Sequence, residues 1–159
     1  MIKIIDSVDI NTIKKELHSL SKETICLQGI SHKQDPSYGI GAVKNFTHSP
    51  DKKMRDQEKE FIFPLFDLPY TNSIVEKFNM FRTRIMVQDS KTCYTYHQDF
   101  TPRIHIPLVT NENCFFILED SLHRLKGDGS VYWVDTVQRH TAVNASLKTR
   151  IHLVGCVDA

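Results

Sequence analysis

The second half of the chain repeats one pattern, in which apolar and polar side chains alternate over short stretches. In the first of these stretches, Phe81, Thr83, Ile85 and Val87 alternate with Arg82, Arg84, Met86 and Gln88. A period of two predicts β-strands, because successive side chains of a strand point to opposite faces. Strand candidates lie at residues 81–88, 92–96, 103–109, 114–119, 121–126, 131–135, 141–144 and 150–157. Turn-forming runs such as Gly127-Asp128-Gly129 separate several of them, which favours a sandwich or jelly roll over a sheet with crossover helices.

The first half of the chain has a mixed pattern. Residues 2–5 and 24–27 are typical of short strands. Asp9 is a suitable N-cap for a helix with an apolar stripe at Ile10, Ile13, Leu17 and Leu20, and Pro69 opens a second short helix. The 159 residues are therefore expected to form one domain. In it an α/β portion, residues 1–80, flanks an all-β portion, residues 81–157.

Residues 29–60 show little periodicity and are rich in glycine, proline, serine and aspartate. Within this segment, residues 51–60 are almost all charged. The favoured interpretation of the charged run is a solvated loop or helix face. The alternative is a lid over a substrate site, because long loops in compact domains are often functional.

The composition excludes several classes of protein. Lys and Arg number 20 and Asp and Glu 19, so the chain lacks the basic excess of a dedicated nucleic-acid binder. Its apolar runs are far too short for a membrane span, and Asp6 comes too early for a secretory signal. The four cysteines form no CxxC pair and indicate buried free thiols. A cytoplasmic protein is expected, with no membrane or nucleic-acid partner.

Three residues in the β portion have the chemistry of a metal site. His97 and Asp99 are two apart, so in an extended backbone their side chains point to the same side. His140 follows 43 residues after His97, within the same run of strands. Two histidines and one carboxylate with open coordination positions form the facial triad of non-haem Fe(II) oxygenases. Eight histidines in one chain make this spacing a weak signal by itself, and surface or core histidines remain an alternative.

Cationic residues on the neighbouring strands strengthen the metal-site hypothesis. Arg150 lies ten residues after His140 and begins an otherwise apolar final strand. Inside a barrel its charge needs an anion, and a dicarboxylate would suit the planar guanidinium; an acid of the chain itself is the alternative. Arg103 and His105 share one face of another strand. His152 shares a face with Arg150, although a hydrogen-bonded core histidine is the favoured interpretation.

Residues 81–157 also resemble a known family. The resemblance is carried by Arg82-Thr83-Arg84-Ile85, Tyr96-His97-Gln98-Asp99, Arg103-Ile104-His105-Ile106-Pro107-Leu108, Gly129, Trp133-Val134-Asp135, His140-Thr141-Ala142-Val143-Asn144 and Arg150-Ile151-His152-Leu153-Val154. These segments resemble the aspartyl/asparaginyl β-hydroxylase family of 2-oxoglutarate-dependent Fe(II) oxygenases. The resemblance implies a mainly β fold with flanking helices, a double-stranded β-helix (jelly roll, cupin-like).

The same resemblance implies roles for individual residues. His97, Asp99 and His140 are expected to bind Fe(II). Arg150 is expected to hold the distal carboxylate of 2-oxoglutarate, and Arg103 and His105 to help position this co-substrate. Residues 1–80 match less well and are expected to contribute to substrate selection.

The implied activity is that of a dioxygenase that uses Fe(II), 2-oxoglutarate and O₂. It hydroxylates an unactivated C–H bond of an amino-acid side chain, in a peptide, a protein or a free amino acid, and releases succinate and CO₂. Two other classes stay open: a cupin-type metalloenzyme that does not use 2-oxoglutarate, and a non-catalytic jelly-roll binding module. The oligomeric state does not follow from the sequence.

Overall fold

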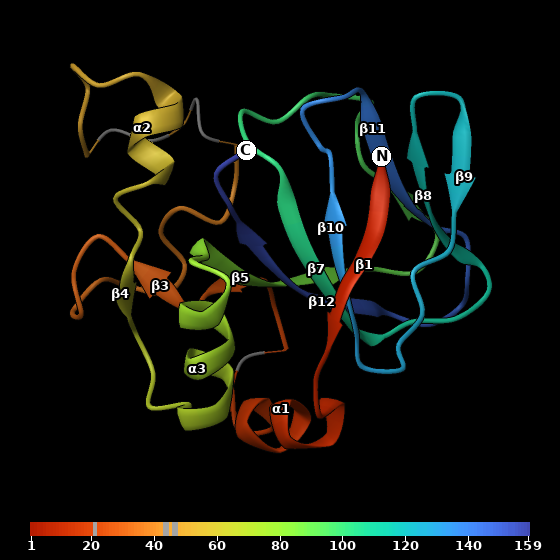
Figure 1. Ribbon diagram of the computed structural model, residues 1–159, viewed down its shortest axis with the longest axis horizontal. Helices are drawn as coiled ribbons and strands as arrows, with labels where there is room; N and C mark the ends of the chain where they lie inside the picture. Colours follow the sequence, from red (N-terminus) through yellow and green to blue (C-terminus); the bar gives the residue numbers. More distant parts are fainter. Residues whose placement is uncertain (21, 43–44, 46–47) are drawn as a thin grey trace.

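Two antiparallel β-sheets dominate the computed structural model, which describes residues 1–20, 22–42, 45 and 48–159 (Figure 1). The larger sheet has the strand order β1 (Ile2–Ser7), β10 (Ser130–Val134), β7 (Arg103–Val109), β12 (Arg150–Cys156), β5 (Phe81–Gln88) and β2 (Ile25–Cys26). The smaller sheet has the order β6 (Thr92–Cys93), β11 (His140–Asn144), β8 (Cys114–Leu118) and β9 (Ser121–His123). This arrangement confirms the expected jelly roll.

The two-residue alternation assigns the two faces of the larger sheet. Ile104, Ile106 and Leu153 belong to an apolar core on its outer face. Arg103 and Arg150, which precede these residues on β7 and β12, point to the inner face and are also buried. Both faces of this sheet are therefore covered, one by apolar and one by polar side chains.

The outer face of the larger sheet is covered by two helices, α1 (Ile10–Leu17) and α3 (Pro69–Lys77). Asp9 caps α1 as predicted, by accepting hydrogen bonds from the backbone N–H groups of residues 11 and 12. Ile13 of α1 and Ile74 of α3 pack in the outer core. Within the described part of the chain, none of the helices is long and apolar enough to cross a lipid bilayer.

A second core lies between the two sheets. It consists of Phe116, Leu118, Leu125, Tyr132, Val134 and Ala142. Leu125 explains why β9 ends at His123, before the predicted end at residue 126: the chain leaves the strand and turns inward, so that Leu125 is buried. This inner core keeps the sheets in contact at one end of the jelly roll.

Three further details differ from the sequence expectations. The predicted strand 92–96 is paired only at Thr92–Cys93, and the chain then continues to the rim of the jelly roll. Strands β1 and β2 precede residue 81 but belong to the larger sheet, so the first half of the chain is built into the jelly roll. Of the four free thiols, three are buried as predicted, whereas Cys93 is exposed.

The described residues of the segment 29–60 lie at the side of the jelly roll, next to the C-terminus (Figure 1). The segment follows β3 (Gln28–Gly29), which pairs with β4 (Phe63–Pro64), and it contains the helix α2 (Met54–Glu58). The interpretation of the charged run as a solvated face is wrong for Gln57 and Glu58, which are 4% and 0% exposed. The alternative of a lid includes residues 43–44 and 46–47, which lie outside the described residues.

Candidate metal centre

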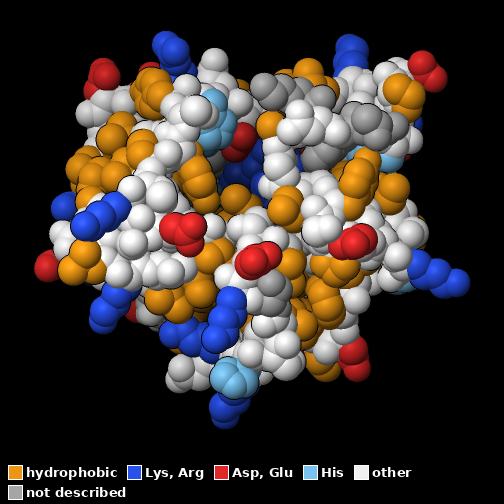
Figure 2. Space-filling model, turned by 180° about the vertical axis from the view of Figure 1, so that it is seen from behind, with side chains coloured by type: hydrophobic (Ala, Val, Ile, Leu, Met, Phe, Trp, Pro, Cys, Tyr) orange, Lys and Arg blue, Asp and Glu red, His pale blue; other side chains and the backbone are white. Residues whose placement is uncertain are grey.

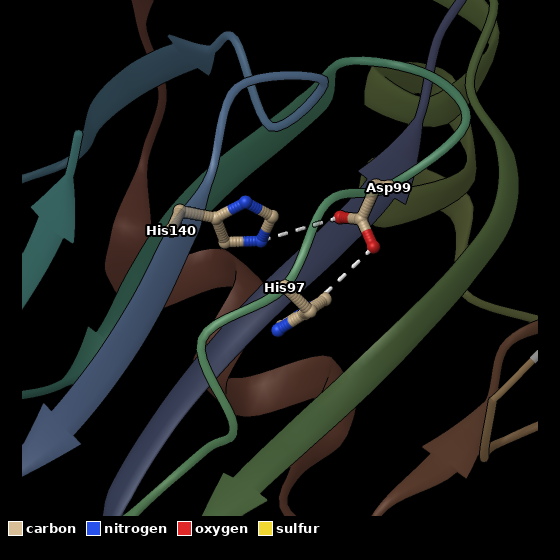
Figure 3. A group of neighbouring side chains, drawn as sticks. All are labelled: His97, Asp99 and His140. Atoms are coloured by element: carbon tan, nitrogen blue, oxygen red, sulfur yellow. Dashed lines mark ion pairs between the residues drawn. The ribbon is translucent and has the colours of Figure 1, made fainter.

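The backbone brings His97 and His140 together at the rim of the jelly roll. The N–H of His97 donates to the carbonyl of His140 at 3.0 Å, and the N–H of His140 donates to the carbonyl of His97 at 2.8 Å. This reciprocal pair is an isolated antiparallel bridge, which places both side chains on one side of the two strands. The imidazole ring centroids are 4.4 Å apart (Figure 3).

Asp99 completes a group of three side chains. Its backbone N–H donates to the carbonyl of Thr136 at 2.8 Å, which fixes the loop after His97. Its carboxylate oxygens lie 3.6 Å from Nε2 of His97 and 3.5 Å from Nε2 of His140, as the dashed lines in Figure 3 mark. The ligand atoms of all three residues lie within 4.8 Å of one another.

These separations fit a bound metal ion. Donor atoms about 2.1 Å from one metal, at right angles, lie about 3 Å apart. Direct N–H···O hydrogen bonds between the same groups would be closer than the observed 3.5–3.6 Å. The space between the three side chains therefore suits a cation better than a direct contact.

The protonation of both imidazoles is set by the backbone. Nδ1 of His97 lies 2.6 Å from the carbonyl of Thr95, and Nδ1 of His140 lies 2.9 Å from the carbonyl of Gln138. A carbonyl only accepts, so each Nδ1 carries the proton and each neutral ring has its lone pair on Nε2, the atom that faces Asp99. This is the orienting arrangement that metal-binding histidines have.

The charges around the site favour ligands in their metal-binding forms. Burial opposes ionisation of Asp99, but the charge of Arg103 and the contacts with the two histidines hold its pKa well below the usual value. Burial lowers the pKa of His140, which favours the neutral imidazole. The contact with Asp99 raises the pKa of His97 despite partial burial. When no cation is bound, the Asp99 carboxylate therefore favours the protonated, positively charged form of His97.

Arg103 joins this group to a carboxylate that the sequence analysis missed. Its Nε lies 3.4 Å from Asp99, and its Nη2 lies 3.1 Å from Glu58. Its Nη1 donates to the carbonyl of Thr101 at 2.8 Å and to the hydroxyl of the same residue. The guanidinium is thus fully engaged by the chain itself. Glu58 lies in a run of charged residues that shows no periodicity. The one sequence signal for a buried acid was that arginines facing the interior require an anionic partner.

Arg150 has a different environment from Arg103. It is 4% exposed, and it donates to Oε1 of Gln88 at 3.2 Å and to Nδ1 of His152 at 2.9 Å. No carboxylate contacts it among the residues that the structure describes. Burial lowers its pKa to about 10, so the guanidinium remains charged at neutral pH. The alternative that an acid of the chain pairs with this arginine therefore has no support in the described residues.

The hydrogen bond from Arg150 fixes the tautomer of His152. A guanidinium only donates, so Nδ1 of His152 accepts and its proton is on Nε2. That Nε2 is buried and has no hydrogen-bond partner within the described part of the chain. The interpretation of His152 as a fully hydrogen-bonded core residue is therefore wrong for one ring nitrogen. Both residues line a narrow pocket together with Thr110, Cys114, Phe115, Phe116 and Leu125.

A row of rings connects this pocket to the candidate metal ligands. Phe116 stacks on His140, with centroids 5.3 Å apart and planes at 7°. His105 lies against the edge of Phe116 at 5.5 Å, and its Nδ1 is 3.3 Å from Nδ1 of His152. Burial, together with the charge of Arg150, keeps the pKa of His105 well below its usual value, so this ring is neutral. The sequence-predicted residues thus form one connected interior group.

The molecular surface is hollowed on the face opposite to that of Figure 1. Figure 2 shows this hollow, with basic and acidic side chains visible deep inside it and largely uncharged atoms around it. Charged groups at such depth keep their charge only when they are paired or meet a ligand. The hollow thus exposes charged side chains of the interior on this face.

The fold and the donor set together define a jelly-roll protein with a candidate mononuclear metal centre of the facial-triad type. The model of the aspartyl/asparaginyl beta-hydroxylase family matches residues 8–158, and the chain belongs to this family.

Two solved structures are similar to the chain at low sequence identity. No curated protein matches it significantly. A Cupin 2 conserved barrel domain protein from Salinispora arenicola CNS-205 aligns with a TM-score of 0.40 and 17% identity over 48% of this chain and 62% of that protein. The nickel complex of the non-haem monooxygenase ThoJ aligns with a TM-score of 0.40 and 12% identity over 55% of this chain and 49% of that protein. The chain thus spans less than two thirds of either structure.

Proposed function

We propose that the protein is an Fe(II)- and 2-oxoglutarate-dependent dioxygenase that hydroxylates an amino-acid side chain. The observation that carries this proposal is the environment of Arg150. A buried guanidinium with no carboxylate contact in the described chain faces the same interior as a facial-triad donor set. Such a charge is costly unless an anion meets it, and 2-oxoglutarate has a carboxylate at the end remote from its keto acid.

The atoms around Arg150 fit a bound carboxylate. The guanidinium offers a planar pair of donors, and the adjacent Nε2–H of His152 is a buried donor that lacks an acceptor among the described residues. Donors of both kinds are suited to a carboxylate. When bound, Fe(II) and 2-oxoglutarate supply the oxygen activation that cleavage of an unactivated C–H bond requires, with succinate and CO₂ as co-products.

The chain itself contributes binding, orientation and exclusion of water. His97, Asp99 and His140 would hold the metal ion, and three protein ligands would leave room for the co-substrate to bind the same ion. Arg103 holds Asp99 from behind at 3.4 Å, and the apolar core between the sheets keeps water away from the interior. His105 lies between the two halves of the site as a neutral ring that can donate a hydrogen bond without adding charge.

A second buried guanidinium supports an amino-acid substrate. Arg84 is 7% exposed and lies on the same face of β5 as Gln88, which contacts Arg150. It donates to the carbonyl of Ile40 at 3.2 Å, and its buried Nε has no partner among the residues described. In the proposed function, Arg84 meets an anionic group of the primary substrate, such as the carboxylate of an amino acid, free or within a peptide.

The proposal is tested by anaerobic titration of the Fe(II)-loaded protein with 2-oxoglutarate. A chelated keto acid is expected to produce a metal-to-ligand charge-transfer band. 2-Oxobutyrate, which has the keto acid but no distal carboxylate, serves as the matched control and should bind far more weakly. Iron binding without a band would indicate a metalloenzyme that does not use 2-oxoglutarate, and failure to bind any divalent metal would indicate a binding module. Either outcome overturns the proposal.

A further inference from the structure

Glu58 is a completely buried carboxylate at the end of the short helix α2. It is 0% exposed, and its Oε1 accepts from Nη1 of Arg82 at 2.6 Å and from Nη2 of Arg103 at 3.1 Å. Its other oxygen, Oε2, is buried and has no partner in the described chain. Acids are almost never fully buried unless they are paired, so this position demands the two arginines.

Arg103 therefore contacts two carboxylates that belong to different parts of the fold. On one side it contacts Glu58, from the segment of residues 29–60, and on the other it contacts the candidate metal ligand Asp99. The contact with Asp99 is the longer of the two, 3.4 Å against 3.1 Å. The guanidinium thus lies between the two carboxylates, and the oxygens of Asp99 also lie 3.5–3.6 Å from the two histidines.

This bridge matters for metal binding because Arg103 and a metal ion compete for the same carboxylate. If the charge of Glu58 were absent, Arg103 would keep its hydrogen bonds to Thr101, but Asp99 would be its one remaining carboxylate contact among the described residues, and the guanidinium would pair with Asp99 more closely. An Asp99 held in this way is a poorer ligand. The charge on Glu58 therefore favours the geometry in which Asp99 faces the metal.

The same carboxylate also fixes the segment of residues 29–60 to the jelly roll. Arg82, which pairs with Glu58, donates through Nε and Nη2 to the carbonyl of Gly39 at 3.0 and 2.8 Å and also to the carbonyl of Gly41. Glu58 and Arg82 thus connect two separate parts of this segment to β5. The docking of the segment and the support of Asp99 depend on one buried group of charges.

We propose that Glu58 is a positioning residue of the metal centre: by holding Arg103 away from Asp99, it allows Asp99 to ligate the metal, so that tight metal binding requires α2 to be docked. This inference rests on the metal site of the proposed function. Glu58 lies outside residues 81–157, the β portion that contains the triad and that showed the resemblance in the sequence analysis.

The experiment compares Co(II) binding by the wild type, Glu58→Gln and Glu60→Gln. Glu60 is a matched control because it loses the same charge two residues away in the same segment, where it is partly exposed, pairs with Lys52 and His48, and does not contact Arg103. Loss of a residue that orients a metal ligand typically weakens metal binding about 10- to 100-fold, and this is the expected rise in the Co(II) dissociation constant for Glu58→Gln. Glu60→Gln should bind Co(II) like the wild type.

A spectrum separates positioning from a general loss of stability. If Glu58 acts through Asp99, the visible ligand-field spectrum of Co(II) in Glu58→Gln should shift towards that of Asp99→Ala. A variant that is only less stable would keep the wild-type spectrum in its folded fraction. Should Glu58→Gln not fold, Glu58→Asp keeps the charge but shortens its reach, and it should show the same shift to a smaller extent.

Two results would overturn the inference: a wild-type spectrum and affinity in folded Glu58→Gln or Glu58→Asp, or an equal loss of affinity in Glu60→Gln. The failure of the proposed function has a different signature. In that case the wild type would bind Co(II) but not respond to 2-oxoglutarate, while the difference between the Glu58 and Glu60 variants would persist.

Discussion

Arg150 donates a hydrogen bond to Nδ1 of His152 at 2.9 Å, and this contact leaves the Nε2–H of His152 buried without a partner in the described chain. A positive charge and an unused donor thus lie side by side in the interior. Protein stability alone explains neither the buried charge nor the unused donor, because burying such groups without an anion or an acceptor costs free energy. Together they mark the position in the interior at which a small anion would gain the most binding free energy.

Replacement of Arg150 should weaken binding of 2-oxoglutarate and leave metal binding almost unchanged. Breaking a buried charge pair costs about 3–5 kcal/mol. At roughly 1.4 kcal/mol per tenfold, 2-oxoglutarate should therefore bind on the order of a hundred- to a thousand-fold more weakly to Arg150→Met. Arg150→Lys should recover only part of the loss, because lysine lacks the planar pair of donors. Dissociation constants and iron content measure both effects, and unchanged affinity in Arg150→Met would exclude this residue from the co-substrate site.

The two histidines of the centre should differ in their effect on stability. His97→Ala and His140→Ala should each abolish tight iron binding, because each removes an imidazole, a ligand that suits iron better than a carboxylate does. The side chain of His97 is 40% exposed, so its loss should change the melting temperature little. His140 is buried and stacks on Phe116, a ring contact of about 0.5–1.5 kcal/mol, so His140→Ala should melt at a lower temperature. Iron stoichiometry and thermal unfolding test this asymmetry, and equal melting temperatures would contradict it.

Asp99→Ala should retain more metal affinity than either histidine variant. Two imidazoles and the chelating co-substrate remain as ligands in that variant. Removal of the Asp99 carboxylate also leaves Arg103 paired with Glu58, through an ion pair that is already present in the wild type. The measurement is the Fe(II) dissociation constant with and without 2-oxoglutarate. A co-substrate that fails to restore any affinity would show that the carboxylate is indispensable.

Acid should destabilise the fold through the buried histidines. Burial and the charge of Arg150 hold the pKa values of His105 and His152 well below 6.5 in the folded protein. The unfolded chain therefore takes up protons first as the pH falls through 6.5, so stability is present above that value and is lost below it. The loss is about 1.4 kcal/mol per pH unit for each such histidine.

The raised pKa of His97 acts in the opposite direction and offsets part of this loss. Urea unfolding at about pH 7.5, 6.5 and 5.5 measures the net slope, since these values lie on both sides of the ordinary histidine pKa. His152→Gln should reduce the slope below pH 6.5, because one of the two buried titrating rings is then absent. A free energy of unfolding that does not change over this range would contradict the assignment of neutral buried rings.

The turn before β10 should tolerate no side chain at Gly129. This glycine has φ +92°, and an added Cβ would lie 2.5 Å from the backbone oxygen of Val8. Gly129→Ala should therefore destabilise the fold by about 1–3 kcal/mol. Gly41→Ala is the matched control, because among the described residues its Cβ would meet Asn45 alone, at 3.9 Å. Equal free energies of unfolding for the two variants would contradict this account.

The sequence predicted the parts of the fold that depend on local pattern. The alternation on β7 and β12 correctly separated the inward-facing Arg103 and Arg150 from the apolar residues that face the helices. The spacing of His97, Asp99 and His140, together with the family resemblance, predicted a group that the fold brings together. In both cases the two-residue period of a strand determines the direction of the side chains.

The sequence could not predict the position of Glu58. Its burial depends on Arg82 and Arg103, which are 24 and 45 residues away and come from two different strands. Its neighbours in the chain are charged, so the local pattern indicates solvent. The unpartnered nitrogen of His152 was also invisible, because it follows from the geometry of a single hydrogen bond with Arg150.

The larger sheet has apolar side chains on one face and arginines and histidines on the other, and this contrast fixes the register in which its strands pair. A slip of one residue in the pairing of β7 or β12 would turn Arg103 or Arg150 towards the apolar core under the helices, and isoleucine and leucine towards the polar interior. Each such slip would bury a charge without a partner, so the competing registers are strongly disfavoured. The alternation that builds the site therefore also ensures that the strands pair in a single register.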